Sequence, residues 1–190
     1  MEYSYDMEQP ERTFSTNDQE GSAKRFSTET IAAPDKETFR DLLAIEQRAV
    51  PDESLDEADL RTALENPRAI TIALRDRETQ NIIGFISALP NSDVYDELYN
   101  DDPAFENNPQ KLYVYDIAID EDARGLKNFL GLVRPLIEQA KGQGFQALTM
   151  HTRTSEGLSD VLQKRYGARL VRIMENWQGW GRYDYLELDL

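Results

Sequence analysis

KLYVYDIAIDEDARGLKNFLGLVRPLIEQAKGQG, the segment from Lys111 to Gly144, decides the fold of this chain. Residues 112–119 are rich in β-branched and aromatic side chains and too apolar for a surface strand, so they predict a buried central strand. From Leu126 to Ala140, apolar residues recur at steps of three and four. This spacing predicts a helix that ends near Gly142. A buried strand therefore leads through an acidic turn directly into a helix.

The turn at Arg124 and Gly125 lies just before this predicted helix. The first N–H groups of a helix have no helical acceptor, and that end carries a partial positive charge. The turn is therefore a candidate site for an anion such as a phosphate. Most connections of this kind bind nothing, so the pattern alone does not identify a ligand.

Length, charge and cysteine content limit the possible functions. A chain of 190 residues suits one folded domain with a full core. The net charge of −15 argues against nucleic acid or an anionic membrane as partner and favours a basic, amine-bearing one. An acidic surface that serves only solubility is an equal alternative. The chain has no cysteine and a single histidine, His151, so we expect neither disulfides nor a metal site.

The ends and the middle of the chain differ in composition. Residues 1–25 are mostly polar and acidic, and predict a disordered or loosely docked acidic tail before a domain at 26–190. Residues 90–110 predict an irregular acidic insertion, which either gathers a cationic substrate or is a solvated loop. No long apolar run and no signal-peptide pattern occur, so we expect a cytoplasmic protein without a membrane partner.

The remaining patterns predict an α/β (α+β) fold. The expected order is strand, two helices, three strands, helix, strand, helix and two strands. The strand after the third helix needs a right-handed crossover, so it should run parallel to the central strand. We expect a mixed, mostly antiparallel sheet of about seven strands flanked by about four helices. The predicted strands are 26–33, 69–74, 82–89, 112–119, 145–152, 170–174 and 183–190, and the helices start near Asp35, near Ser54 or Asp56, at Leu126 and at Ser155.

The strand, turn and helix of residues 111–144 resemble the GNAT superfamily of acyl-CoA N-acetyltransferases. In that family a motif Q/R-x-x-G-x-G/A follows the central strand, and the helix start receives the pyrophosphate of acetyl-CoA. Arg124 matches the first motif position, whereas the two glycine positions hold Lys127 and Phe129, so the acetyl-CoA motif is degenerate. The resemblance covers residues 26–190 and implies the GNAT fold.

The pattern is most similar to the branch that acetylates protein N-termini, such as that of ribosomal-protein alanine. This similarity rests on Ile45-Glu46 with Pro51, on Arg153 and Ser155, and on Glu175-Asn176-Trp177 with Gly181 and Asp184. Two further positions depart from the family. Glu156 replaces an asparagine beside the cofactor, and Gln163 replaces the tyrosine that protonates the departing thiolate; glutamine has no titratable proton.

The resemblance implies transfer of an acetyl group from acetyl-CoA to a primary amine by direct attack. The acceptor would be a peptide N-terminus, a lysine or a small amine, and the negative charge of the chain favours a basic protein or peptide. Asp116 and Glu46 are the candidate general bases. The candidate cofactor-binding residues are Ile117, Ala118 and Ile119 on the strand, and Arg124, Gly125, Leu126, Lys127, Asn128 and Phe129 at the helix start.

The four departures keep a second class of function open, that of a catalytically inactive GNAT-fold domain with a binding or regulatory role. His151 stands where the branch commonly has an acidic residue, and a surface or core histidine is the favoured interpretation. The final hairpin is a candidate edge for a homodimer. The sequence does not specify the acceptor or the acyl group.

Overall fold

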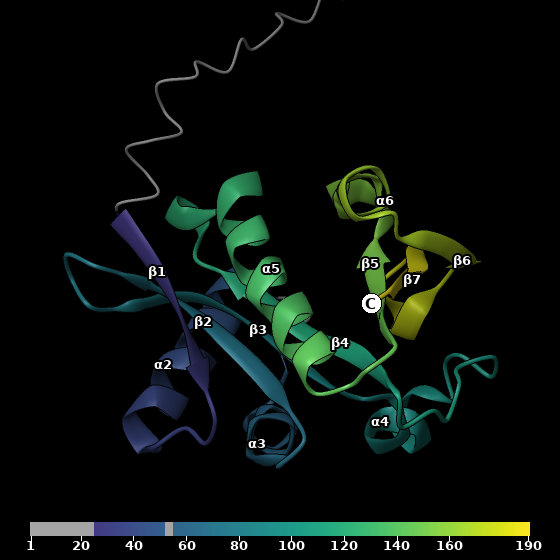
Figure 1. Cartoon of the computed structure of the whole chain (residues 1–190), viewed down its shortest axis with the longest axis horizontal. Helices are drawn as coiled ribbons and strands as arrows, with labels where there is room; N and C mark the ends of the chain where they lie inside the picture. The colour runs from purple at the N-terminus through teal and green to yellow at the C-terminus, as the bar shows by residue number, and fades with distance from the viewer. Residues whose placement is uncertain (1–24, 52–54) are drawn as a thin grey trace, which may run out of the picture.

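A computed structural model describes residues 25–51 and 55–190 and contains one seven-stranded sheet. The strands are β1 (Phe26–Ile31), β2 (Ile70–Asp76), β3 (Ile82–Pro90), β4 (Lys111–Ile119), β5 (Ala147–Arg153), β6 (Arg169–Met174) and β7 (Tyr183–Asp189). Their order is β1-β2-β3-β4-β5-β7-β6 (Figure 1). Only β4 and β5 are parallel. The predicted mixed sheet, with residues 112–119 at its centre and a parallel fifth strand, is confirmed.

Helices cover both faces of the sheet, as Figure 1 shows. They are α2 (Lys36–Ala49), α3 (Glu57–Glu65), α4 (Asn91–Leu98), α5 (Leu126–Gly142) and α6 (Leu158–Tyr166). The apolar sides of α5 and α6 share one core cluster with β2–β5 and β7. Those of α2 and α3 pack on the other face, where α4 joins them. The described chain thus has five α-helices, against about four expected.

Aspartates begin the first two helices. Asp35 accepts a hydrogen bond from the Thr38 N–H at 2.8 Å and caps α2. Asp56 caps α3 by accepting from the N–H groups of Ala58 and Asp59. Such caps satisfy N–H groups that have no helical acceptor. Of the two residues predicted to start α3, Asp56 does so, while Ser54 lies outside the described residues, as do positions 1–24 of the predicted acidic tail.

Helix α4 occupies residues that the sequence predicts to be irregular. Its apolar side consists of Val94 and Leu98, which repeat at four-residue spacing and are buried. Pro90 precedes the helix and provides no side-chain cap. A helix of eight residues without a cap depends on tertiary packing rather than on its own propensity. The irregular prediction for residues 91–98 was wrong because acidic residues hide this short apolar pattern.

A buried ion pair ties the chain after α4 to β6. Asp102 is 1% exposed and accepts hydrogen bonds from Arg172, one of them from Nε at 3.0 Å. Three residues later, the ring of Phe105 packs edge-on against Tyr113 and Tyr185, with centroids 5.5 and 6.1 Å away. Residues 102–105 are therefore part of the core rather than a solvated loop.

His151 lies beside this ion pair and is neutral. Its Nδ1 is 2.9 Å from the hydroxyl of Tyr113, and its ring stacks on Trp177 at 3.7 Å. Nε2 lies 3.4 Å from a carboxylate oxygen of Asp102, whose charge Arg172 already balances. Burial lowers the pKa of His151 to about 3. The favoured interpretation of a core histidine agrees with this geometry.

Within residues 25–51 and 55–190, no helix has the length and apolar character needed to cross a membrane.

Loss of the Asp102 carboxylate should destabilise the fold strongly. Asp102→Ala leaves the Arg172 charge without its buried partner, which typically costs about 3–5 kcal/mol of unfolding free energy. Urea denaturation measures this loss. The control Glu65→Ala removes an exposed partner of Arg61 and should change stability by less than about 1 kcal/mol. Equal effects of the two substitutions would contradict the anchoring role of Asp102.

His151 should make the fold sensitive to acid. The pKa of this side chain is about 3 in the folded chain and about 6.5 when unfolded, so the unfolded state binds the extra proton between these values. Stability is therefore lost as the pH falls below about 6.5, by about 2 kcal/mol at pH 5. His151→Phe lacks this proton. Urea denaturation at pH 7 and pH 5 should show a smaller acid loss in the variant, and identical losses would disprove the prediction.

Candidate active site

Strands β4 and β5 separate after a short paired region. Their register covers only Lys111–Ala147, Leu112–Leu148 and Tyr113–Thr149. Figure 1 shows the two strands diverging beyond these pairs. Within the described strands, residues 114–119 of β4 have no pairing partner on β5. We call the space between 114–119 of β4 and 150–153 of β5 the slot.

A β-bulge in β4 accompanies this separation. On β3, Ser87 pairs with Asp116 and the next residue, Ala88, pairs with Val114, so Tyr115 is an extra residue. A bulge bends its strand and increases the local twist. The second half of β4 can therefore follow β3 while it leaves β5. The sequence does not reveal the bulge, because Val114, Tyr115 and Ile117 all favour a regular strand equally.

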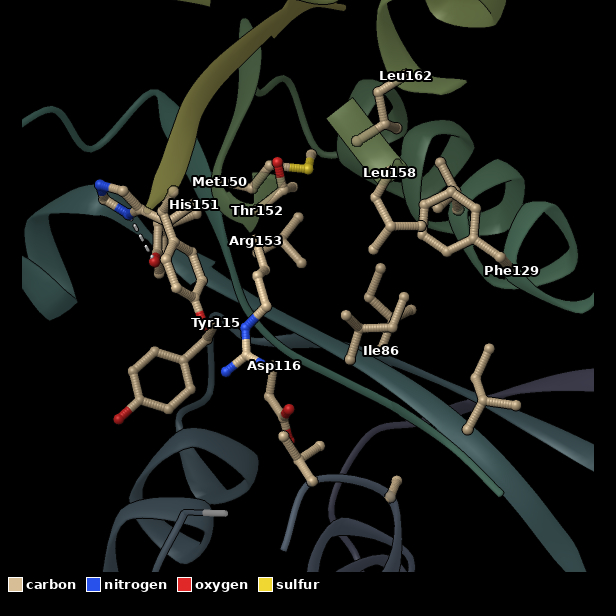
Figure 2. A pocket seen from close by; sticks show the side chains of 18 of the residues that line it. Ile86, Tyr115, Asp116, Phe129, Met150, His151, Thr152, Arg153, Leu158 and Leu162 are labelled. Atoms are coloured by element: carbon tan, nitrogen blue, oxygen red, sulfur yellow. Dashed lines mark hydrogen bonds between the residues drawn. The ribbon is translucent and has the colours of Figure 1, made fainter. Parts of the chain in front are cut away.

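A cavity of about 780 Å³ fills the slot. Figure 2 shows an apolar wall on one side and polar side chains on the other. The apolar wall includes Phe129 from α5, Leu158 and Leu162 from α6, and Ile86 from β3. An apolar cavity with a few converging polar groups is the usual form of a small-molecule site. Its polar residues include Glu46, Glu97, Tyr115, Asp116 and Arg153.

The two predicted general bases meet at the polar side of the slot. Glu46 lies in the last turn of α2 and is 1% exposed, while Asp116 follows the bulge. Oε1 of Glu46 accepts a hydrogen bond from the Leu55 N–H at 3.0 Å. Oε2 of Glu46 and Oδ2 of Asp116 are buried and accept no hydrogen bond from another described residue, but the two carboxyl groups lie close enough to hydrogen-bond each other when one of them is protonated. The structure thus brings together two residues that are 70 positions apart in the sequence.

Burial and mutual repulsion keep a proton on this pair. Burial, and then the charge of Glu46, raise the pKa of Asp116 well above its ordinary value. Burial also raises the pKa of Glu46, against the opposing effect of its hydrogen bond from Leu55. A carboxylate with a raised pKa is a stronger base once it has lost its proton. The pair is therefore suited to accepting a proton from a bound ammonium group.

Glu97 is a cavity residue that sequence reasoning did not single out. It lies on α4 and accepts hydrogen bonds from the Tyr115 hydroxyl at 3.0 and 3.2 Å. Burial raises the pKa of Glu97, and burial together with this carboxylate raises the pKa of Tyr115. Glu97 was missed because its helix was missed. It adds a third carboxyl group to the polar side of the slot.

The start of α5 presents backbone N–H groups that lie before the first helical hydrogen bond. Gly125 precedes the helix with φ of 141°, a conformation that favours glycine, and no side chain caps this end. The first helical hydrogen bond runs from the Phe129 N–H to the Gly125 carbonyl, at 3.1 Å. The N–H groups of Leu126, Lys127 and Asn128 therefore precede the first helical donor. Such an end suits an anionic group.

Most predicted cofactor-binding residues line the cavity. These are Ile117, Ile119, Arg124, Gly125, Leu126 and Phe129. The guanidinium of Arg124 also bridges two elements, since it donates to the carbonyls of Ile119 at 3.3 Å and Ala49 at 2.5 Å. Arg124 thus holds the end of β4 against the end of α2.

Three predicted cofactor-binding residues have side chains that do not line the cavity. Ala118 packs among the side chains of α2 and α3 on the opposite face of the sheet, so only its backbone belongs to the slot. Lys127 is exposed and Asn128 half-buried, and neither lines the cavity. The side-chain amide of Asn128 donates to the Ala123 carbonyl at 2.6 Å. The side chains of these three residues are therefore not brought to the cavity.

Phe129 forms part of the apolar wall of the cavity and does not close the gap between β4 and β5. Its ring lies beside Leu158 in Figure 2 and belongs to the main core cluster. The slot combines a strand edge without a pairing partner on β5, an apolar wall and a helix start whose first N–H groups precede the helical hydrogen bonds. An acyl-CoA has matching parts, namely an arm with amide groups, apolar methylenes and a diphosphate. The residues present therefore fit this cofactor.

The family position for a proton-donating tyrosine holds a glutamine that is engaged elsewhere. Gln163 donates to the Ser159 hydroxyl at 2.9 Å and does not line the cavity. The tyrosines that do line it are Tyr113, Tyr115 and Tyr183. The structure does not describe the side chain of Glu156. No described group of three or more acidic and histidine side chains is placed to hold a metal ion.

Comparison with known proteins assigns the chain to a family. A family profile described as Acetyltransferase (GNAT) family matches residues 36–161, more than half of the chain. No curated protein matches this chain. Similar solved structures include ribosomal-protein-S18-alanine N-acetyltransferase from Escherichia coli, with 16% identity, a TM-score of 0.65, and coverage of 86% of this chain and 94% of that one.

Two other solved structures share the fold. Ribosomal-protein-alanine N-acetyltransferase from Brucella melitensis has 18% identity and a TM-score of 0.65, over 86% of this chain and 99% of that one. An aminoglycoside 6'-N-acetyltransferase complexed with coenzyme A has 16% identity and a TM-score of 0.62, over 86% and 96%. Together with the family match, the shared architecture shows that this chain belongs to the GNAT family of acetyltransferases.

Proposed function

We propose that this protein transfers an acetyl group from acetyl-CoA to a primary amine, on a peptide N-terminus, a lysine or a small molecule. The observation that carries the proposal is the slot, in which a free strand edge faces a cavity with two buried carboxyl groups. Two neighbouring carboxyl groups removed from water are costly to the fold when they carry negative charge. A cationic substrate would offset this cost by supplying hydrogen-bond donors and a positive charge.

The β4 edge and the start of α5 would hold the cofactor. The backbone groups of 117–119 are available as the edge of an incomplete ladder, and the N–H groups of 126–128 suit a diphosphate. Lys127 lies next to these N–H groups and adds a positive charge. Acetyl-CoA would supply the acyl thioester that the amine attacks.

Asp116 and Glu46 would bind the ammonium form of the acceptor and remove its proton. With one proton shared, the pair carries one negative charge, which matches a single ammonium group. Glu97 adds negative charge on the same side of the cavity. The net charge of −15 attracts a basic protein or peptide at long range. Two structural neighbours are named as acting on ribosomal-protein alanine, which is consistent with a peptide acceptor.

Isothermal titration with acetyl-CoA should show binding to the full chain. Lys127→Glu should weaken this binding about three- to tenfold, because it places a negative charge beside the proposed diphosphate site. Lys36→Glu makes the same charge change at the exposed start of α2 and is the control. Equal effects would reject the phosphate assignment. No binding at millimolar acetyl-CoA would reject the transferase and favour the inactive GNAT-fold binding domain.

Removal of either proposed base should slow acetyl transfer. Asp116→Asn and Glu46→Gln should each lower kcat by about 10²–10⁴-fold, the usual contribution of general base catalysis. Because the pKa of both groups is raised, kcat/KM should increase with pH above the ordinary carboxyl range, and the variants should lose this increase. Release of the CoA thiol measures the rates. Asp160→Asn on the exposed side of α6 is the control, and full activity in both variants would exclude the pair from the mechanism.

We also propose that two copies associate through β6. This strand forms an edge of the sheet and exposes Leu170, Val171 and Ile173 by 38–41%. Exposed apolar edge strands favour pairing with another chain. Light scattering should report a dimer that becomes a monomer in Val171→Glu/Ile173→Glu. Tyr99→Glu alters an equally exposed residue beyond α4 and should leave the dimer intact, whereas a monomeric natural chain would contradict the proposal.

A further inference from the structure

A second, open hollow adjoins the slot at the end of β5. It has a volume of about 470 Å³ and is lined by Arg153, Thr154, Ser155, Trp180 and Arg182. Arg153 and Trp180 also line the slot cavity, so the two cavities meet at these residues. Figure 2 shows the Arg153 side chain extending from β5 into the space that faces Asp116. We call this second cavity the hollow.

The lining of the hollow is unusual for this protein. The described residues that line it are two arginines, a threonine, a serine and a tryptophan, and none of these five carries a carboxylate. The whole chain has 36 acidic and 21 basic residues, so most of its surface has the opposite character. Arginine side chains are the typical groups for binding a carboxylate or a phosphate. The hollow therefore has the features of an anion site.

Arg182 keeps donors available for such an anion. Its side chain is 52% exposed, and the carboxylate placed nearest to it, that of Glu175, is 3.9 Å away. This separation is too long for a hydrogen bond. By contrast, Arg172 on the neighbouring strand is fully engaged with buried Asp102. Arg182 is thus placed at the hollow without a strong internal partner among the described residues.

Backbone hydrogen bonds hold the hollow in shape. The N–H and the hydroxyl of Thr154 both donate to the Arg182 carbonyl at 3.1 Å, which joins the end of β5 to the start of β7. In the loop before β7, the Trp177 N–H donates to the Gly181 carbonyl and the Trp180 N–H donates to the Trp177 carbonyl, each at 2.8 Å. Trp177 is buried, whereas Trp180 is 41% exposed. The backbone around the hollow is thus held in place before a ligand binds.

We propose that the hollow binds an acidic side chain of a peptide acceptor, at position two or three of the peptide whose N-terminal amine is acetylated. This inference rests on the proposed function, because it places the amine at Asp116 and Glu46. The carboxylates of the slot bind the positive end of the acceptor, and the hollow binds a negative group a short distance away. The negative net charge of this protein attracts a basic partner at long range. The hollow, by contrast, selects for an acidic side chain among the first residues of the partner's peptide chain.

Peptide binding tests the proposal without the need for catalysis. The probes are hexapeptides with a free N-terminus that carry aspartate at position two or three, each compared with its asparagine counterpart. The chain has two tryptophans, and Trp180 lines the hollow, so intrinsic fluorescence reports the titration. At least one aspartate peptide should bind about fivefold or more tightly than its counterpart, as expected for a partly exposed charge-assisted hydrogen bond.

Arginine variants assign the preference to the hollow. Arg182→Glu should reduce the ratio of the two dissociation constants to one or invert it, and Arg182→Gln should give an intermediate ratio. Arg77→Glu makes the same charge change in the exposed turn between β2 and β3 and should preserve the ratio. Equal affinities of all aspartate and asparagine pairs for the natural chain would overturn the proposal. A ratio unchanged in Arg182→Glu would overturn the assignment to the hollow.

The acetyl-CoA titration and the peptide titrations test the transferase and the hollow independently. If the natural chain discriminates between the peptides but does not bind acetyl-CoA, the transferase is rejected, while the hollow stands as a site of peptide recognition. If acetyl-CoA binds and is turned over without any preference for acidic peptides, the hollow is rejected and the transferase stands.

Discussion

The bulge at Tyr115 is the constraint on which the site depends. β4 pairs with β3 along its length but with β5 over three residues, so one edge of a central strand carries polar groups without a sheet partner. Backbone groups in such a place are normally satisfied by another strand, by water or by a ligand. An extended molecule with amide groups satisfies them best, and this gives the cavity a preferred kind of occupant.

The same bulge fixes the electrostatics of the site. It places Asp116 at the opening, opposite the end of α2, where Glu46 is already buried. Glu46 combines two roles, because Oε1 accepts a hydrogen bond from the Leu55 N–H while the carboxyl group also faces the cavity and Asp116. Two buried carboxyl groups lower the stability of the folded state when both are ionised. Their arrangement is therefore easier to explain by a cationic substrate than by the fold itself.

The sequence predicts those parts of the structure whose signals are local. The apolar density of 112–119 and the periodicity of 126–140 identify the central strand and its helix, and the crossover rule then gives the parallel pair. The bulge, helix α4 and the position of Glu97 were missed, because they depend on contacts with distant residues. Asp116 and Glu46 were proposed as general bases from the resemblance, whereas their closeness in space could only be seen in the structure.

The departures at Lys127 and Phe129 alter the wall of the site more than its backbone. The unusual backbone angle at the helix start belongs to Gly125, which this chain retains, and both departing residues follow it in ordinary helical conformation. Phe129 joins the core and contributes its backbone N–H to the first helical bond, while Lys127 remains exposed. Side chains at these positions can crowd a diphosphate, but they do not change the backbone path that places the first N–H groups of the helix before its first hydrogen bond. The loss of two motif glycines therefore leaves a backbone geometry at this helix start that suits an anionic group.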